Sequence, residues 1–123
     1  MGKSILVYEG GESMRMEEEV VEAGVNGALR FLAAQKMIDT AIPPAAETIL
    51  CQNSRWIRAK RSGIYRGTIK SGMTVNKGDV LGHITDPFGE FSTTIKAPVN
   101  GLVICHNNMP VVNQGDALIH LGV

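Results

Sequence analysis

A carboxylate that follows a short apolar run is the first candidate for chemistry in this sequence. Residues 4–8 read Ser-Ile-Leu-Val-Tyr, a nearly continuous apolar stretch of the kind that forms a buried strand. Glu9 comes directly after it, and Gly10 and Gly11 then signal a turn. Ligands of α/β folds collect at the carboxyl edge of the sheet, where this side chain would project. We therefore take Glu9 as the candidate catalytic carboxylate and Glu12 as its competitor, and a solvated turn glutamate is the alternative interpretation.

A basic cluster in the second half of the chain is the candidate for binding an acidic group. Arg58, Lys60 and Arg61 follow Trp56 closely. Arginine makes bidentate hydrogen bonds with carboxylates, so Arg58 and Arg61 are our candidates to hold a substrate carboxylate. The alternative is an edge strand whose charged side chains are solvated.

The histidines and cysteines do not form a metal-binding pattern. His83, His106 and His120 all lie in the second half, and no His-x-x-Glu occurs anywhere. His83 and His120 occupy equivalent repeat positions, and a symmetric metal pair is conceivable. Two imidazoles with no thiol or carboxylate nearby are weak evidence for it, so histidines on a half-exposed strand face are the favoured interpretation and we assign no metal ligand. Cys51 and Cys105 are far apart in the sequence and are expected to be free thiols in a reducing compartment.

The bulk composition excludes several classes of partner. Hydrophobic residues make up 44% and charged residues 20% of 123 residues, which is typical of globular proteins. Twelve basic and twelve acidic residues give a formal charge of zero, so neither nucleic acid nor a membrane surface is expected as a partner. No apolar stretch approaches the roughly 18 residues of a membrane span, and residues 5–8 are too few for a signal-peptide core. We expect a cytoplasmic protein.

The first third of the chain reads as part of an α/β domain. A helix is predicted over residues 17–37, because glutamates fill its first turn and an apolar stripe follows at helical spacing: Val21, Val25, Ala28, Leu29 and Leu32. Gly24 and Gly27 cost helix propensity, which close packing would offset. One strand and one helix do not make a domain. We therefore interpret residues 1–38 as the last strand and helix of a domain whose other strands lie upstream.

The remainder of the chain reads as a linker and an all-β domain. Residues 39–55 contain Pro43-Pro44 and few periodic apolar positions, which is typical of a linker or crossover. A short strand within it is considered at residues 48–51. From residue 56 to residue 123, turn signals separate short β-rich runs. Strands are expected at residues 56–60, 64–69, 80–85, 90–97, 102–106 and 117–121.

The β region contains an internal repeat. Residues 62–84 align with residues 100–121, so that Val-Asn-Lys-Gly-Asp at 75–79 matches Val-Asn-Gln-Gly-Asp at 112–116. Leu81 then matches Leu118, and His83 matches His120. Such a repeat indicates one supersecondary unit used twice, and Asn-x-Gly-Asp is a turn in which glycine supplies a positive φ. We expect a flattened barrel with two-fold pseudosymmetry.

These turns, with Ala97-Pro98 and Gly101, resemble the biotinyl/lipoyl carrier fold, the barrel-sandwich hybrid. That family carries its modified lysine at a hairpin tip before the Ala-Pro pair. Here the stretch 86–91 reads Asp-Pro-Phe-Gly-Glu-Phe and has no lysine, while Lys96 is out of register. The fold resemblance stands, but the carrier function is not supported.

The chain as a whole resembles the C-terminal part of the succinylglutamate desuccinylase/aspartoacylase family, whose members are similar to zinc carboxypeptidases. The matching features are Leu-Val-Tyr-Glu-Gly-Gly-Glu at 6–12, Trp-Ile-Arg-Ala at 56–59 and the Gly-Asp repeat. The resemblance implies an α/β catalytic domain with zinc on a His-x-x-Glu pair and a later histidine, followed by a β domain. It also implies that Glu9 is the general base that activates water. Because the zinc ligands are absent here, we expect a C-terminal fragment that is inactive alone.

Two hypotheses from different classes follow. In the first, the intact protein is a zinc-dependent hydrolase that cleaves an amide or ester bond and deacylates an N-acyl amino acid or a similar small substrate, with the β domain shaping or covering the active site. Its partners would be the upstream zinc-bearing domain and the substrate. In the second, the chain is a non-enzymatic carrier of biotinyl/lipoyl type. A structural or homo-oligomerising β domain is a third interpretation.

Overall fold

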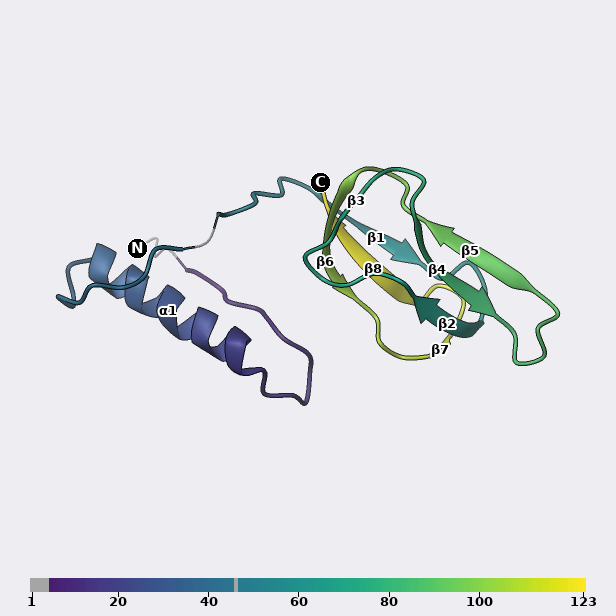
Figure 1. Ribbon diagram of the computed structural model, residues 1–123, viewed down its shortest axis with the longest axis horizontal. Coiled ribbons are helices and arrows are strands. Elements are labelled where there is room, and N and C mark those ends of the chain that lie inside the picture. Colours follow the sequence, from purple (N-terminus) through teal and green to yellow (C-terminus); the bar gives the residue numbers. More distant parts are fainter. Residues whose placement is uncertain (1–4, 46) are drawn as a thin grey trace. The chain divides into compact units, whose positions relative to one another are not determined.

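The computed structural model describes residues 5–45 and 47–123 of the chain (Figure 1). It divides into two compact units, and the boundary lies between Thr48 and Ile49. This boundary falls inside the segment 39–55 that the sequence indicates as a linker. The assignment of residues 1–38 to a catalytic domain stays a prediction. None of the helices in the described ranges is long and apolar enough to cross a membrane.

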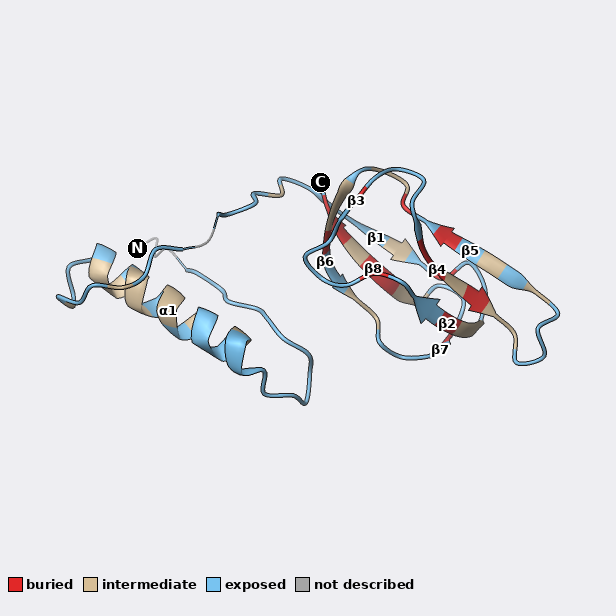
Figure 2. Ribbon diagram, viewed as in Figure 1, coloured by how far each residue is buried: buried red, intermediate tan, exposed pale blue. Residues whose placement is uncertain are grey.

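The first unit contains one helix, α1, at Glu18–Ala34. It lies within the helix predicted over residues 17–37. Glu18 and Glu19 occupy its first turn, where carboxylates stabilise the positive end of the helix dipole. After Ala34 the backbone turns, and Lys36 has a φ of 58° that cannot continue a right-handed helix. None of the helix residues is buried, and Figure 2 shows α1 in tan and pale blue only.

The strand expected over residues 4–8 is not formed. Residues 5–8 form no strand, and Ser4 lies outside the described residues. Ile5, Leu6 and Val7 are 81%, 76% and 76% exposed. A strand needs a hydrogen-bonding partner, and the described part of the first unit contains no second strand. The short strand considered near residues 48–51 is also not formed.

The second unit is built from eight strands in two antiparallel sheets, which confirms the mainly β fold class (Figure 1). One sheet has the order β1-β8-β6-β3 and the other β5-β4-β2-β7. The strands are β1 Ser54–Arg58, β2 Gly63–Gly67, β3 Thr74–Val75, β4 Val80–Thr85, β5 Ser92–Lys96, β6 Gly101–His106, β7 Val111–Val112 and β8 Ala117–Gly122. The six expected strands are all present, and β3 and β7 are additional short ones.

The two sheets have the same internal order once the repeat is taken into account. Strands β1, β8, β6 and β3 of one sheet correspond to β5, β4, β2 and β7 of the other. The correspondence therefore extends beyond the aligned residues 62–84 and 100–121 to include β1 and β5. Ala59 and Ala97 mark this extension, because the amide of Ala59 donates to Asp116 O at 2.8 Å and that of Ala97 to Asp79 O at 2.9 Å.

The two Gly-Asp turns have matching hydrogen bonds. The Asp79 carboxylate accepts a hydrogen bond from the Asn76 amide at 2.7 Å, and the Asp116 carboxylate accepts one from the Asn113 amide at the same distance. Gly78 has a φ of 96° and the equivalent Gly115 a φ of 95°. These values lie in the region that glycine adopts without a steric penalty. The turn chemistry expected from Asn-x-Gly-Asp is therefore present twice.

Equivalent side chains from both halves fill one core. Leu81 and Leu118 are fully buried, and Val75 and Val112 are 3% and 1% exposed. In Figure 2 the buried residues lie along the strands of the second unit. Most positions along β4 and β8 are buried, so both strands lie within this core. This apolar burial is the main source of stability for the unit.

Candidate functional site

Glu9 follows a tyrosine that anchors the extended segment to α1. The Tyr8 hydroxyl donates a hydrogen bond to Val20 O at 2.6 Å. The Tyr8 ring lies against Gly24, where a Cβ atom would be 2.7 Å from Tyr8 Cε1. A side chain at this position would therefore displace the ring. Close packing explains a glycine inside the helix, and it fixes the chain immediately before Glu9.

The two candidate carboxylates differ in their surroundings. Glu9 is exposed and, within the part of the chain that the structure describes, has no side-chain hydrogen bond or ion pair. Glu12 forms an ion pair with Arg15, with Oε2 3.2 Å from Nε. Between them, Gly11 adopts a φ of 81°. The geometry leaves the Glu9 carboxylate available to accept a proton from a bound molecule, but its catalytic role stays a prediction.

The basic residues of the second unit are held by separate contacts. Arg58 Nη1 donates to Gly115 O at 2.9 Å, which ties β1 to the second Gly-Asp turn. The Arg61 guanidinium lies over the Phe91 ring, 3.6 Å from its centroid, in a cation–π contact. Lys60 is exposed. These contacts do not bring Arg58 and Arg61 onto a common ligand, and substrate binding by these residues stays a prediction.

The three histidines lie in different environments. The ring of His120 stacks on Trp56. The Nδ1 atom of His83 lies 3.4 Å from the hydroxyl oxygen of Thr94. His106 lines a pocket. Across residues 5–45 and 47–123, no group of three or more His, Cys, Asp or Glu side chains could hold a metal ion. The described residues therefore do not fit a zinc site.

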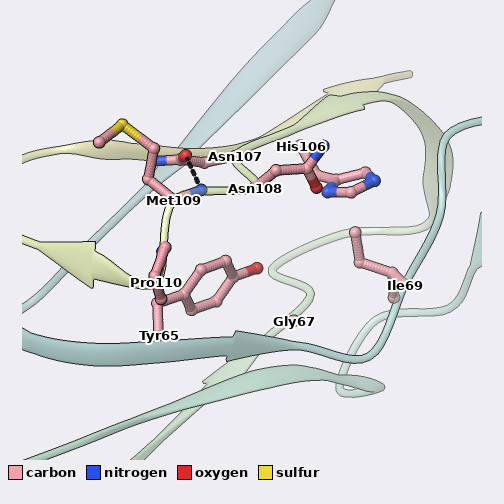
Figure 3. Close-up of a pocket in the computed structure, with 8 residues that line it drawn as sticks. All are labelled: Tyr65, Gly67, Ile69, His106, Asn107, Asn108, Met109 and Pro110. Carbon is pink, nitrogen blue, oxygen red and sulfur yellow. Dashed lines mark hydrogen bonds between the residues drawn. The ribbon is translucent and has the colours of Figure 1, made fainter. Parts of the chain in front are cut away.

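Sequence reasoning missed a pocket next to β2. It has a volume of about 210 Å³ and is lined by Tyr65, Gly67, Ile69 and residues 106–110 (Figure 3). Tyr65 is only 5% exposed, and its hydroxyl has no hydrogen-bond partner in the described structure. Burial raises the pKa of Tyr65 above its usual value. The hydroxyl is therefore a neutral, unsatisfied donor at physiological pH.

Missing side chains on two neighbouring strands make room for the Tyr65 ring. A Cβ at Gly67 would lie 3.0 Å from the Tyr65 hydroxyl, and a Cβ at Gly82 would lie 3.0 Å from Tyr65 Cε2. In the repeat, Tyr65 corresponds to Val103 and Gly82 to Ile119. This break in the symmetry was the signal in the sequence that could have pointed to the pocket.

A second, more open depression lies on the outer face of the β5-β4-β2-β7 sheet. Its volume is about 510 Å³, and it is lined by Arg66, Gly67, Thr68, His83, Thr85 and Ser92. Arg66 and His83 are cross-strand partners in the β2–β4 ladder. None of the residues that the sequence singled out for substrate binding contributes to it.

No family model matches the sequence. No curated protein matches it either. Solved structures do match. One is a succinylglutamate desuccinylase/aspartoacylase family protein from Shewanella amazonensis, with 23% identity and a TM-score of 0.78, covering 89% of this chain and 32% of that one.

Further solved structures agree with this match. The ectoine utilization protein EutE (DoeB) from Ruegeria pomeroyi has 20% identity and a TM-score of 0.78, covering 89% of this chain and 36% of that one. A succinylglutamate desuccinylase/aspartoacylase from Rhodobacter sphaeroides has 21% identity and a TM-score of 0.68, covering 87% of this chain and 36% of that one. The chain thus spans about a third of the length of these proteins. The resemblance expected from the sequence is confirmed at the level of the fold.

Proposed function

We propose that this chain is part of a zinc-dependent deacylase that hydrolyses a linear amide in an N-acyl amino acid or a similar small substrate. The observation that carries the proposal is the shared fold over 89% of the chain with succinylglutamate desuccinylase/aspartoacylase family structures. The order of the Tyr8-Glu9-Gly10-Gly11 segment, α1 and the repeated β unit adds support from the sequence. At these identities the fold is shared, and the chemistry is our inference.

The exposed apolar residues of the first unit support a larger catalytic domain as partner. Val21, Val25 and Phe31 of α1 are 46%, 53% and 47% exposed, and Ile5 and Leu6 are more exposed still. Tyr8 contacts α1 at Gly24 and leaves these side chains exposed. A helix with apolar residues on more than one side is typical of the interior of a larger domain. We propose that the zinc-bearing part of the enzyme covers these residues.

In this proposal Glu9 is the proton carrier of the reaction. Its carboxylate would accept a proton from the attacking water and pass it to the leaving amine. Tyr8 would position Glu9 by fixing the preceding backbone through its hydrogen bond to Val20 O. Glu12 is the second candidate, but its pairing with Arg15 makes it less available.

The metal would be held by residues other than those described here, which lack a suitable group of ligands. When bound, zinc would polarise the substrate carbonyl and lower the pKa of bound water. The chain alone is therefore proposed to be inactive.

The β unit is proposed to be a barrel-sandwich hybrid that shapes or covers the active site. Two sheets with corresponding strand orders and paired Gly-Asp turns support this fold. Arg58 retains N–H donors beyond the one used on Gly115 O, so a substrate carboxylate could still bind it. A cytoplasmic location is part of the proposal, as free Cys51 and Cys105 suit a reducing compartment.

A carrier function is the alternative, and one observation favours it. A single-chain, multi-domain long-chain acyl-CoA carboxylase shares the fold over 80% of this chain and 9% of its own, with 22% identity and a TM-score of 0.52. The segment 86–91 has no lysine to modify. Intact mass after co-expression with a biotin or lipoate ligase discriminates the two, because an adduct would establish the carrier and its absence removes it.

The deacylase is tested with the longer protein that contains this chain. We expect it to release free amino acid from members of a panel of N-acyl amino acids, and the 123-residue chain alone to release none. Hydrolysis by the isolated chain would show that the zinc-bearing partner is not required.

A further inference from the structure

The depression on the outer face of the β5-β4-β2-β7 sheet (the outer depression) contains a fixed positive charge. Arg66 of β2 lines it and is exposed. The lining has no aspartate or glutamate, and the one ion pair among the described residues joins Arg15 to Glu12 elsewhere. A guanidinium stays charged at physiological pH and can only donate hydrogen bonds. The outer depression therefore favours an anion over a cation or a neutral molecule.

Two hydroxyl groups from the neighbouring strands line the same depression. Thr85 of β4 and Ser92 of β5 are direct cross-strand partners, and both belong to the lining. Within residues 5–45 and 47–123, neither hydroxyl has a hydrogen-bond partner in the protein. The Thr68 hydroxyl, in contrast, donates to Val80 O at 3.2 Å. Thr85 and Ser92 are therefore free to donate to an acceptor that the charge of Arg66 attracts.

The equivalent place in the other sheet has different chemistry. There His120, the repeat counterpart of His83, has Trp56 as its cross-strand partner, and the two rings stack with centroids 4.1 Å apart. His83 instead lies between Thr94 on β5 and Arg66 on β2. One position of the repeated scaffold is thus packed against an aromatic ring, whereas the other is surrounded by hydrogen-bonding groups beside an open depression. This difference indicates a ligand in the second case and packing in the first.

The size of the outer depression and the spread of its donors limit the ligand further. A volume of about 510 Å³ lies within the range of small-molecule sites, about 300–1,000 Å³. The donors come from three adjacent strands, β2, β4 and β5 (Figure 1). A carboxylate has two oxygens in one plane, whereas a phosphate group has three acceptor oxygens and a charge of about −1.5 to −2. A phosphate group can therefore bind a guanidinium through two oxygens and still accept a hydrogen bond from a hydroxyl.

We propose that the outer depression binds the phosphate group of a small molecule. Arg66 holds two of the phosphate oxygens, and the hydroxyl of Thr85 or Ser92 donates to a third. The His83 imidazole lies beside the bound group. This site lies entirely within the second unit, and the proposal is independent of the deacylase activity.

The test is a titration of the full 123-residue chain with inorganic phosphate at constant neutral pH and ionic strength, followed through the histidine ring signals in NMR. We expect a saturable shift of the His83 signal with a Kd on the order of 10 mM or below, as suits a ligand of few atoms. The His120 signal should stay in place, which provides a control within the same molecule. Acetate should bind at least about threefold more weakly, because it has fewer oxygens and less charge. Parallel shifts of the two histidines, no saturable shift, or equal affinity for acetate would overturn the proposal.

Four variants separate a phosphate site from a general attraction between opposite charges. Arg66→Gln removes the charge from an exposed position and should weaken phosphate binding about fivefold or more. Arg66→Lys keeps the charge but loses the bidentate geometry, so its affinity should be intermediate. Thr85→Val removes one hydroxyl and should weaken binding about twofold or more. Arg55→Gln, the matched control, removes an exposed arginine from β1 and should leave the affinity unchanged. Wild-type affinity in Arg66→Gln, or equal losses in Arg66→Gln and Arg55→Gln, would contradict the site.

Discussion

The indole of Trp56 lies flat on the imidazole of His120, with ring centroids 4.1 Å apart and an angle of 4° between the planes. The two residues are direct cross-strand partners in the β1–β8 ladder. At the equivalent place in the other sheet, His83 is paired with Thr94. The stack therefore exists in one half of the pseudosymmetric unit only, and it separates the roles of two histidines that the repeat aligns.

This difference predicts unequal costs of removing the two histidines. His120→Ala should lower the free energy of unfolding by about 1 kcal/mol or more, because aromatic pairs contribute about 0.5–1.5 kcal/mol beyond their buried area. His83→Ala, the matched control, should cost less than half as much. Urea unfolding followed by the fluorescence of Trp56, the single tryptophan, measures both. Equal losses would mean that the stack adds nothing.

Two glycines of α1 give opposite predictions for one substitution. Gly27→Ala meets no atom closer than 3.9 Å and should stabilise the helix by about 1 kcal/mol, the usual gain in propensity. Gly24→Ala gains the same propensity, but its Cβ would lie 2.7 Å from the Tyr8 ring. It should displace Tyr8, break the hydrogen bond to Val20 O and lower stability. Thermal melts by far-UV circular dichroism compare the two, and an increase in stability for Gly24→Ala would refute the packing of Tyr8 on α1.

The buried Tyr65 hydroxyl predicts a loss of stability at alkaline pH. Burial raises the pKa of Tyr65 above 10.0, while the unfolded chain ionises near that value. Above it the folded state binds more protons than the unfolded state, so stability falls as the pH rises towards the folded-state pKa. Below the unfolded-state pKa the hydroxyl is protonated in both states, and the stability is fully retained. The unfolding free energy of wild type relative to Tyr65→Phe should therefore decline between about pH 9 and about pH 11. A constant difference would contradict the burial of this group.

The paired Gly-Asp turns predict equal effects in the two halves. Asp79→Ala and Asp116→Ala each remove an acceptor 2.7 Å from a backbone amide, and each should cost about 1 kcal/mol of unfolding free energy. The asparagine variants keep a side-chain oxygen and should cost less. Chemical denaturation of the four variants tests this, and alanine costs that differ severalfold would show that the turns are not energetically equivalent.

Much of the second unit could be predicted from its sequence. Strand β4 has the predicted ends, because turn residues flank a short β-rich run, and the repeat predicted a second copy as β8. Strands β3 and β7 were missed because two residues are too few to show alternation. The relation of β1 to β5 was missed because their charged residues obscure it, and it emerges from the strand orders of the two sheets and the hydrogen bonds of Ala59 and Ala97.

The first unit and the pocket show what a single sequence does not reveal. An apolar run such as residues 5–8 indicates that a segment can be buried, but it does not provide the partner strand, and here the side chains are exposed. The pocket at Tyr65 depends on side chains that are missing at Gly67 and Gly82. Such a space becomes visible only when three strand positions are brought together.

The central claim is the proposal that Glu9 is the catalytic carboxylate of a deacylase, and the most direct measurement compares Glu9→Gln with Glu12→Gln in the longer protein proposed to contain this chain. Release of free amino acid from the best N-acyl amino acid substrate gives kcat for each variant. Glu9→Gln should lower kcat by about 10²–10⁴-fold, the usual contribution of general acid–base catalysis, and Glu12→Gln should change it little. Wild-type kcat in Glu9→Gln, or hydrolysis of none of the substrates by the unaltered protein, would contradict the account.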